Sequence, residues 1–245
     1  MLRSLFSGIS GLRANATMLD VTGNNIANAN TTGYKGSSTV FQETLSQMLT
    51  APASANAYTG GTNPVQIGLG VQVGSTAMNL TQGSTQLTGR STDLMIQGDG
   101  MFVILSGSEN LYSRAGAFTF DENGDLVNPS GGRVQGYLLD SSGNATGGLV
   151  NVSLDTANAV PAVPAGVELQ SYSIGSDGKI HAIFSDGVLR DLGQLAIADF
   201  TNPMGLERVG DTSFRESANS GTPQFGVSGQ ARRGSLVAGA LEMSN

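Results

Sequence analysis

The sequence predicts a mainly β protein: a helical segment over residues 1–35, an extended linker over 36–70 and an all-β domain over 71–245. Three observations predict this division. Heptad spacing of apolar residues occurs at the N-terminus, small and flexible residues gather at 51–64, and strand patterns with turn signals recur from about Val71 onward.

The N-terminal helix carries one narrow apolar stripe. Its members follow one another at spacings of three and four residues: Leu2, Leu5, Ile9, Leu12, Ala16, Leu19, Gly23 and Ile26. Such a stripe is typical of a coiled-coil seam, and a seam needs a partner helix. No other long helix is predicted, so the expected partner is another copy of this chain or a segment absent from the given sequence.

A second stripe of small residues lies beside the first: Ser4, Gly8, Gly11 and Asn15. Each interior glycine costs a helix about 1 kcal/mol relative to alanine. Two interpretations stay open. The glycines merely weaken a loose terminus, or they allow helix axes to approach closely in an assembly that compensates for the cost.

The helix is expected to end at the turn formers of residues 28–33. A short helical pattern follows from Val40 to Leu49, because Phe41, Leu45 and Met48 share one side. Residues 51–64, rich in Ala, Thr, Gly, Asn and Pro, are typical of an adaptable linker.

Strand patterns in the remainder flank short turn signals, as an all-β domain requires. Three hairpins are predicted: 94–96 with 101–105, 117–120 with 125–127, and 172–174 with 179–184. Residues 195–200 predict a buried strand, and residues 140–166 predict a loop or small insertion.

Composition excludes several classes of protein. Thirty-five glycines, 13% charged residues and a net charge of −7 describe a weakly charged chain without a basic run, so nucleic acid is not an expected partner. Zero cysteines exclude disulfides and thiolate metal sites. No stretch reaches the roughly 18 apolar residues of a membrane span, so no membrane insertion is expected. The amphipathic N-terminus does not fit a cleaved secretory signal.

The sequence features that resemble catalytic or metal sites lack the residues that such sites need. Asp121, Asn123 and Asp125 imitate the start of a calcium loop, but Leu126 stands where glycine is needed. His181, the single histidine, alternates with apolar residues in a strand pattern and is predicted to be structural. We therefore predict no catalytic, cofactor-binding or metal site, and no enzyme.

Several motifs carry a family resemblance. Residues 1–12, the string Asn24-Asn25-Ile26-Ala27-Asn28 and the following Thr32-Gly33-Tyr34-Lys35 resemble the start of bacterial flagellar rod and hook proteins. Segments that resemble the hook branch of this family in particular are 60–64, 66–70, 88–94, 112–118, 214–217 and 239–245. The resemblance covers nearly the whole chain. One departure is that the family continues after Leu-Glu-Met-Ser-Asn into a long helix, which implies a segment beyond Asn245.

The resemblance implies a structural subunit that polymerises with itself into the curved, flexible hook, a universal joint that transmits torque from rod to filament. It implies an extracellular location in the flagellum, reached by flagellar export without a cleaved signal. Expected partners are the hook cap, the distal rod, the hook–filament junction proteins and the export apparatus. The expected self-assembly residues are the seam together with Gly8, Gly11, Asn24, Asn25 and Asn28.

Three alternatives compete with this interpretation. The first is the distal rod protein, a relative that forms a rigid tube. The second is a carbohydrate-binding or adhesive module, although the chain has no Trp and its five Tyr residues are scattered. The third is an enzyme, for which the sequence offers no catalytic set.

Overall fold

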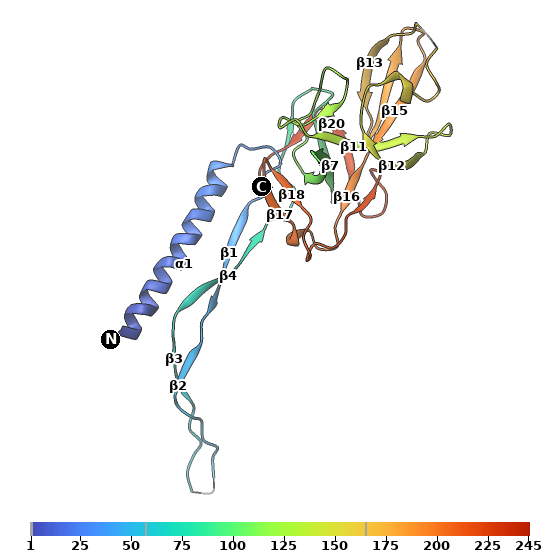
Figure 1. The fold of residues 1–245 in the computed structure, drawn as a ribbon. Coiled ribbons are helices and arrows are strands. Elements are labelled where there is room, and N and C mark those ends of the chain that lie inside the picture. Colours follow the sequence, from blue (N-terminus) through green and yellow to red (C-terminus); the bar gives the residue numbers. More distant parts are fainter. Residues whose placement is uncertain (1, 57, 165) are drawn as a thin grey trace. The chain divides into compact units, whose positions relative to one another are not determined.

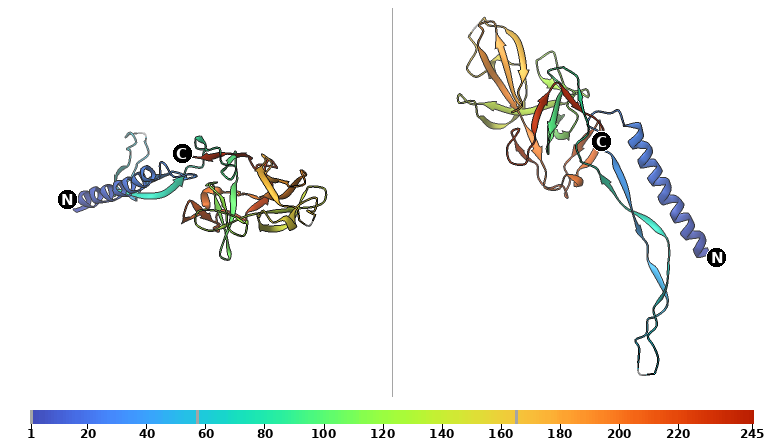
Figure 2. Two further views of the ribbon diagram at one scale, coloured as in Figure 1. Left: turned by 90° about the horizontal axis from the view of Figure 1, so that it is seen from above. Right: turned by 180° about the vertical axis from the view of Figure 1, so that it is seen from behind.

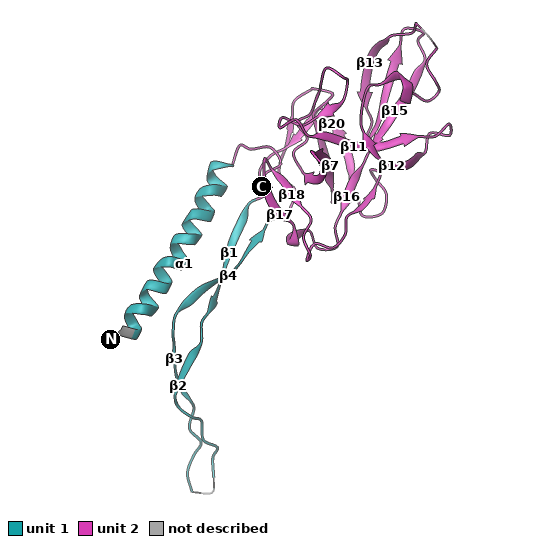
Figure 3. Cartoon of the chain, in the orientation of Figure 1, with its two compact units in different colours: residues 1–28, 36–79 teal, residues 29–35, 80–245 magenta. Residues whose placement is uncertain are grey.

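The computed structural model describes residues 2–56, 58–164 and 166–245, and of Leu2 the backbone alone. The chain divides into two compact units, shown in different colours in Figure 3. Unit 1 comprises residues 1–28 and 36–79, and unit 2 comprises residues 29–35 and 80–245. The described chain consists of one N-terminal α-helix followed by β-strands and two 3-10 turns, which confirms the predicted fold class (Figure 1).

Helix α1 (Leu2–Ala27) ends where the sequence predicts. The segment contains no proline, and the hydroxyls of Thr17 and Thr22 donate to backbone oxygens one turn earlier. After the helix, Gly33 adopts a φ of +67°, a left-handed conformation that glycine reaches without strain.

The rest of unit 1 is a long two-stranded ribbon beside α1 (Figures 1 and 2). β1 (Ser37–Glu43) pairs antiparallel with β4 (Val71–Met78), and β2 (Ser46–Thr50) pairs with β3 (Val65–Gly68). The helix expected at residues 40–49 is therefore wrong. The pattern of Phe41, Leu45 and Met48 fits a helical period, but pairing with residues 65–78 determines the conformation, as is common for short apolar runs.

The ribbon also changes the role of two expected segments. Residues 36–70, expected as an extended linker, supply three of its four strands. Strand β4, which we expected to open the all-β domain at residue 71, instead pairs with β1.

Unit 2 is built on one large antiparallel sheet (Figure 1). In spatial order its main path is β13 (Leu169–Ile174), β14 (Lys179–Phe184), β15 (Leu189–Leu195), β11 (Arg133–Leu139), β7 (Met101–Ser106), β8 (Glu109–Ser113), β18 (Ser213–Arg215) and β17 (Glu207–Gly210). Attached to this path are β9 (Thr119–Phe120), β10 (Leu126–Val127), β12 (Ala145–Asn151), β16 (Ile197–Asp199) and β19 (Gln224–Gly226). Two small pairs complete the unit: β6 (Leu94–Gln97) with β20 (Ser235–Ala238), and β5 (Thr85–Leu87) with β21 (Ala240–Glu242). The two 3-10 turns are η1 (Thr156–Asn158) and η2 (Pro203–Gly205).

The core of unit 2 is aliphatic with a few aromatic contacts. Phe102 and Phe118 meet edge to face with ring centroids 5.1 Å apart, and both are fully buried. Residues 195–198 and Phe200 are buried, which confirms the predicted buried segment. Two predicted hairpins are confirmed, since β9 pairs with β10 and β13 pairs with β14.

The predicted hairpin between residues 94–96 and 101–105 is wrong. β6 pairs with β20, whereas β7 joins the large sheet. Gly98 and Gly100, which resemble a hairpin turn, have φ values of +111° and +121°. A Cβ at Gly100 would lie 2.4 Å from a methyl of Ile197, so this glycine serves close packing.

Residues 140–166, expected as a loop or small insertion, contain regular structure. β12 pairs with β11, and η1 follows it. The two glycines of β12, Gly147 and Gly148, weaken its strand signal in the sequence, which explains why the strand was missed.

Candidate functional site

The heptad seam of α1 faces outward. Its large side chains remain mostly exposed in unit 1: Leu5 59%, Leu12 72%, Leu19 66% and Ile26 70%. Gly23 and Ala16 are also exposed, Ile9 is partly buried, and the side chain of Leu2 lies outside the described residues. Apart from Ile9, which lines a pocket together with Leu69 and Val71, the stripe residues whose side chains are described are left exposed by the ribbon.

The opposite face of α1 packs on the ribbon. Ala14 is 5% exposed, and Val21 is half-buried. Ser10 donates its hydroxyl to the Ser7 carbonyl at 2.8 Å and accepts the backbone N–H of Val71 at 3.2 Å. Small side chains here let the helix approach β4 closely. Sequence reasoning missed this face because Ser and Ala give almost no hydropathy signal, although the spacing of Ser7, Ala14 and Val21 repeats every seven residues.

The stripe of Ser4, Gly8, Gly11 and Asn15 lies beside the seam. A Cβ built at Gly8 or at Gly11 would meet nothing within 4 Å. The helix–ribbon packing of unit 1 therefore does not require either glycine, and the surface above them is open.

The asparagines of the Asn24–Asn28 string act within unit 1. Asn25 Nδ2 donates to the Ser37 carbonyl at 2.7 Å, and its Oδ1 accepts the Ser37 N–H at 3.0 Å. Asn28 Nδ2 donates to the backbone and side-chain oxygens of Asn24 at 2.9 and 3.0 Å. This arrangement ties the end of α1 to the beginning of β1.

The outer part of the ribbon exposes apolar side chains on both faces. All residues of β2 and β3 are exposed, including Met48, Leu49, Val65 and Ile67. An isolated two-stranded hairpin is only marginally stable in water. Together with the seam, these side chains leave several large apolar groups of unit 1 exposed, and large exposed apolar patches mark interaction sites.

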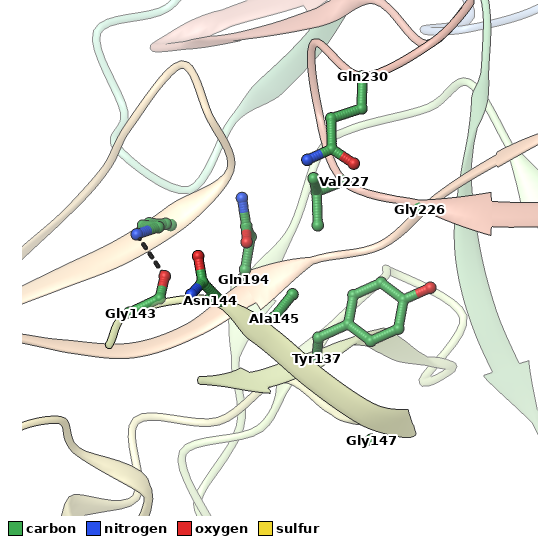
Figure 4. A pocket seen from close by; sticks show the side chains of 10 residues that line it. Tyr137, Gly143, Asn144, Ala145, Gly147, Gln194, Gly226, Val227 and Gln230 are labelled. Carbon is green, nitrogen blue, oxygen red and sulfur yellow. Dashed lines mark hydrogen bonds between the residues drawn. The ribbon is translucent and has the colours of Figure 1, made fainter. Parts of the chain in front are cut away.

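Unit 2 contains a polar cavity of about 390 Å³, shown in Figure 4. Its lining includes Tyr137, Asn144, Lys179, Gln194 and Gln230. Lys179 Nζ donates to the Gly143 carbonyl and Gln194 Nε2 donates to the Asp177 carbonyl, both at 2.8 Å. Burial raises the pKa of Tyr137, against the opposing charge of Arg233. Because the side-chain nitrogens of Lys179 and Gln194 already donate to backbone carbonyls of the chain, they are not available as donors to a ligand in this cavity.

His181 lies 2.6 Å from Asp191, measured from Nδ1 to Oδ1, and faces Ser173 in the strand register. The three residue types of a hydrolase triad thus share one row across β13, β14 and β15. Ser173 is exposed on an edge strand, and among the described residues no hydrogen bond joins it to His181. Activation of a serine needs that contact, so the row is a set of cross-strand pairs.

Two further observations concern metals and membranes. Asp121 Oδ1 accepts the N–H groups of Asn123 and Asp125, both at 2.9 Å, as a turn does. Within the described ranges, no three acidic, His or Cys residues gather in a way that could hold a metal ion. No helix in the described part of the chain is long and apolar enough to cross a membrane.

Two family sequence patterns match this chain. The pattern described as the flagellar hook protein FlgE/F/G D1 domain matches residues 95–182, and the flagella basal body rod protein pattern matches residues 5–35. The first match falls in unit 2, and the second covers α1 from residue 5 onward and the turn after it.

Known proteins are similar over both units. The flagellar basal-body rod protein FlgG of Bacillus subtilis is 42% identical over the whole chain, which spans 85% of that protein. FlgG of Borreliella burgdorferi is 31% identical over the same extents. The flagellar hook protein FlgE of Treponema pallidum is 46% identical over 71% of this chain, but the match spans only 37% of that longer protein.

Proposed function

Given that this chain belongs to the family of flagellar hook and basal-body rod proteins, we propose that it is a structural subunit of the flagellar hook. In this role, copies of the chain polymerise helically into a curved, flexible tube that connects the rod to the filament and transmits torque. A head-to-tail contact that does not close into a ring generates such a helical tube.

The single observation that carries the proposal is the outward seam of α1. Leu5, Leu12, Leu19 and Ile26 form one apolar row on the side of the helix away from the ribbon. The row repeats at heptad spacing and contains no charged residue, so it is suited to pack against a helix with the same pattern. The occupant that we propose is α1 of neighbouring copies.

The free energies of burial and of association favour a polymer, in which each subunit has several neighbours, over an isolated dimer. Burying one large apolar side chain stabilises by about 1.5–3 kcal/mol, so four supply roughly 6–12 kcal/mol at most. Association costs about 4–15 kcal/mol in lost freedom. The free energy gained from a single seam contact is therefore about equal to the cost of association. A subunit in a tube, in contrast, contacts several neighbours at once.

Hook and distal rod remain distinct candidates. The hook is favoured by the segments 60–64 and 66–70, which resemble the hook branch of the family. The distal rod is the second candidate, because relatives named FlgG are 42% and 31% identical over the whole chain, which spans 85% of each. A curved and flexible polymer supports the hook, and a straight and rigid polymer supports the rod.

The proposal extends to location and partners. The subunit acts outside the cell after flagellar export. Its neighbours in the organelle are the hook cap, the distal rod and the hook–filament junction proteins. It uses no cofactor and catalyses no reaction.

Polymerisation of seam variants of the full chain tests the proposal. The double variant Leu12→Ser with Leu19→Ser changes two exposed positions, so the monomer keeps its fold, as circular dichroism can verify. Loss of two buried leucines in the polymer raises the critical concentration for assembly, measured by sedimentation, by about a hundredfold or more.

The matched control is Leu12→Met with Leu19→Met, which keeps the stripe apolar and the helix propensity nearly unchanged. This variant polymerises close to the level of the unmodified chain. Serine variants that polymerise equally well contradict the proposed role of the seam.

A further inference from the structure

A buried carboxylate joins distant parts of unit 2. Glu242, on β21, is 1% exposed. Its Oε1 lies 2.6 Å from Lys35 Nζ and accepts the backbone N–H of Gly83 at 2.9 Å. Its Oε2 lies 3.5 Å from Arg114 Nη1, which is also almost fully buried.

Both cations hold further segments. Lys35 Nζ donates to the Thr81 carbonyl at 2.7 Å. Arg114 donates to the carbonyls of Ile96 and Gly98 at 3.2 and 2.7 Å. The charged cluster therefore binds the backbone of residues 81–83 and of β6 as well as β21.

Backbone bonds complete the same arrangement. The N–H of Gly33 donates to the Glu242 carbonyl at 2.7 Å, and the N–H of Met243 donates to the Ser84 carbonyl at 2.9 Å. Segments 29–35 and 80–83 immediately follow the two points at which the chain enters unit 2. Both are thus fixed by contacts with β21 and the residue after it.

A buried ion cluster is by itself weak evidence for a gain in stability. Burial lowers the pKa of Lys35, and the hydrogen bond and charge of Glu242 only partly oppose this effect. Burial likewise lowers the pKa of Arg114. In buried ion pairs generally, the cost of desolvation can exceed the gain from attraction between the charges. The best-attested role of buried ion pairs is to specify one arrangement of the segments that they join.

We propose that Lys35, Arg114 and the Gly83 N–H form a carboxylate-accepting site whose ligand is Glu242, and that its occupation closes unit 2. Until β21 docks, Lys35 and Arg114 lack the carboxylate of Glu242, and segments 29–35 and 80–83 lack their contacts with β21. The arrival of Glu242 supplies both. This inference concerns folding and does not depend on the proposed function.

The docking of Glu242 is a late step in the formation of unit 2, because Glu242 lies far along the sequence from its partners. Glu242 follows Lys35 by 207 residues and Gly83 by 159 residues. During synthesis or any N-to-C passage, the cations emerge long before their partner. The contacts of the two entry segments with β21 therefore form only when almost the whole of unit 2 is available.

Hydrogen exchange of the full chain tests the site through Glu242→Gln, Lys35→Met and the double variant. In Glu242→Gln, amides of residues 29–35, 80–87 and 235–243 exchange on the order of a hundredfold faster, because two buried cations lose their partner. Amides of β7 and β11 keep their protection. Lys35→Met has a smaller effect, because Arg114 still faces Glu242.

The double variant gives the sharpest prediction. Removing Lys35 as well as the charge of Glu242 leaves one buried cation, Arg114, without that carboxylate instead of two, so the double variant exchanges more slowly than Glu242→Gln alone. Simple loss of packing predicts the reverse order. The matched control is Glu109→Gln, which breaks the exposed pair with Arg215 (2.9 Å) and leaves exchange at the three segments unchanged.

If Glu242→Gln does not fold, Glu242→Asp keeps the charge on a shorter side chain. The proposal expects this variant to fold and to retain more protection than any neutral substitution. Protection of the three segments at the unmodified level in Glu242→Gln overturns the proposal. So does uniform acceleration across unit 2, a double variant that exchanges faster than the single one, or an aspartate variant that does not fold.

Discussion

The side-chain amide of Asn25 forms two hydrogen bonds with the backbone of Ser37: its Nδ2 donates to the Ser37 carbonyl, and its Oδ1 accepts the Ser37 N–H. Asn25 thus bonds the first residue of β1 as a second neighbouring strand would. The sequence showed the Asn24–Asn28 string as a family motif and suggested a role in assembly. It could not reveal the contact with Ser37, because a turn separates the two residues and the string itself has no apolar period. The same applies to Lys35 and Glu242, whose partnership appears only when the chain is folded.

Tyr112 offers a prediction at this scale. Burial, aided by the charge of Glu216, raises its pKa from 10.0 to about 12. Its ring is 2% exposed and meets Phe200 edge to face at 4.8 Å. Because the folded pKa lies above the unfolded one, the stability linked to this group is complete below pH 10 and is lost as pH rises toward 12. Absorbance of phenolate should therefore show one component that titrates near pH 12.

Two comparisons check this assignment. The late component should be absent in Tyr112→Phe and absent in the urea-unfolded chain. A late component that persists in Tyr112→Phe would assign it to another tyrosine.

At the scale of elements, α1 has an outward face with the seam and an opposite face that packs on the ribbon. The sequence predicted only the first. Large apolar residues at heptad spacing predicted the outward seam, since the hydropathy pattern is strong. The ribbon-facing side uses Ser10 and Ala14, whose small side chains carry little pattern information. Residues 40–49 of the ribbon were misread as a helix, because the strands that pair with them, β3 and β4, lie beyond the loop that follows.

Gly8 separates the two roles of the helix. A Cβ at this position meets nothing within 4 Å, so Gly8→Leu should leave the monomer intact and raise intrinsic helix propensity by about 1 kcal/mol. If neighbouring copies approach closely over the glycines, the leucine blocks or distorts polymerisation despite the more stable helix. Polymer yield by sedimentation and monomer helicity by circular dichroism measure the two effects.

Ala14→Leu is the contrasting variant. Ala14 is buried against the ribbon, so leucine there should lower monomer stability by about 1–3 kcal/mol through overpacking. A polymer yield from Gly8→Leu that equals that of the unmodified chain would mean that the small-residue stripe is incidental.

At the scale of the whole molecule, the sequence predicted a helix followed by β structure, the β9–β10 and β13–β14 hairpins and the buried segment near residue 197. It failed where strands far apart in sequence pair. β6 was assigned to β7, its neighbour in sequence, although it pairs with β20 about 140 residues away. Local turn signals carry no information about such partners.

The central claim is that the seam of α1 is the surface through which copies of this chain assemble. Electron cryo-microscopy of the polymer formed by the full chain tests it most directly. We expect a curved tube in which Leu5, Leu12, Leu19 and Ile26 are buried against α1 helices of neighbouring copies. A tube in which these four side chains face solvent, with subunits joined through unit 2 alone, would contradict the account.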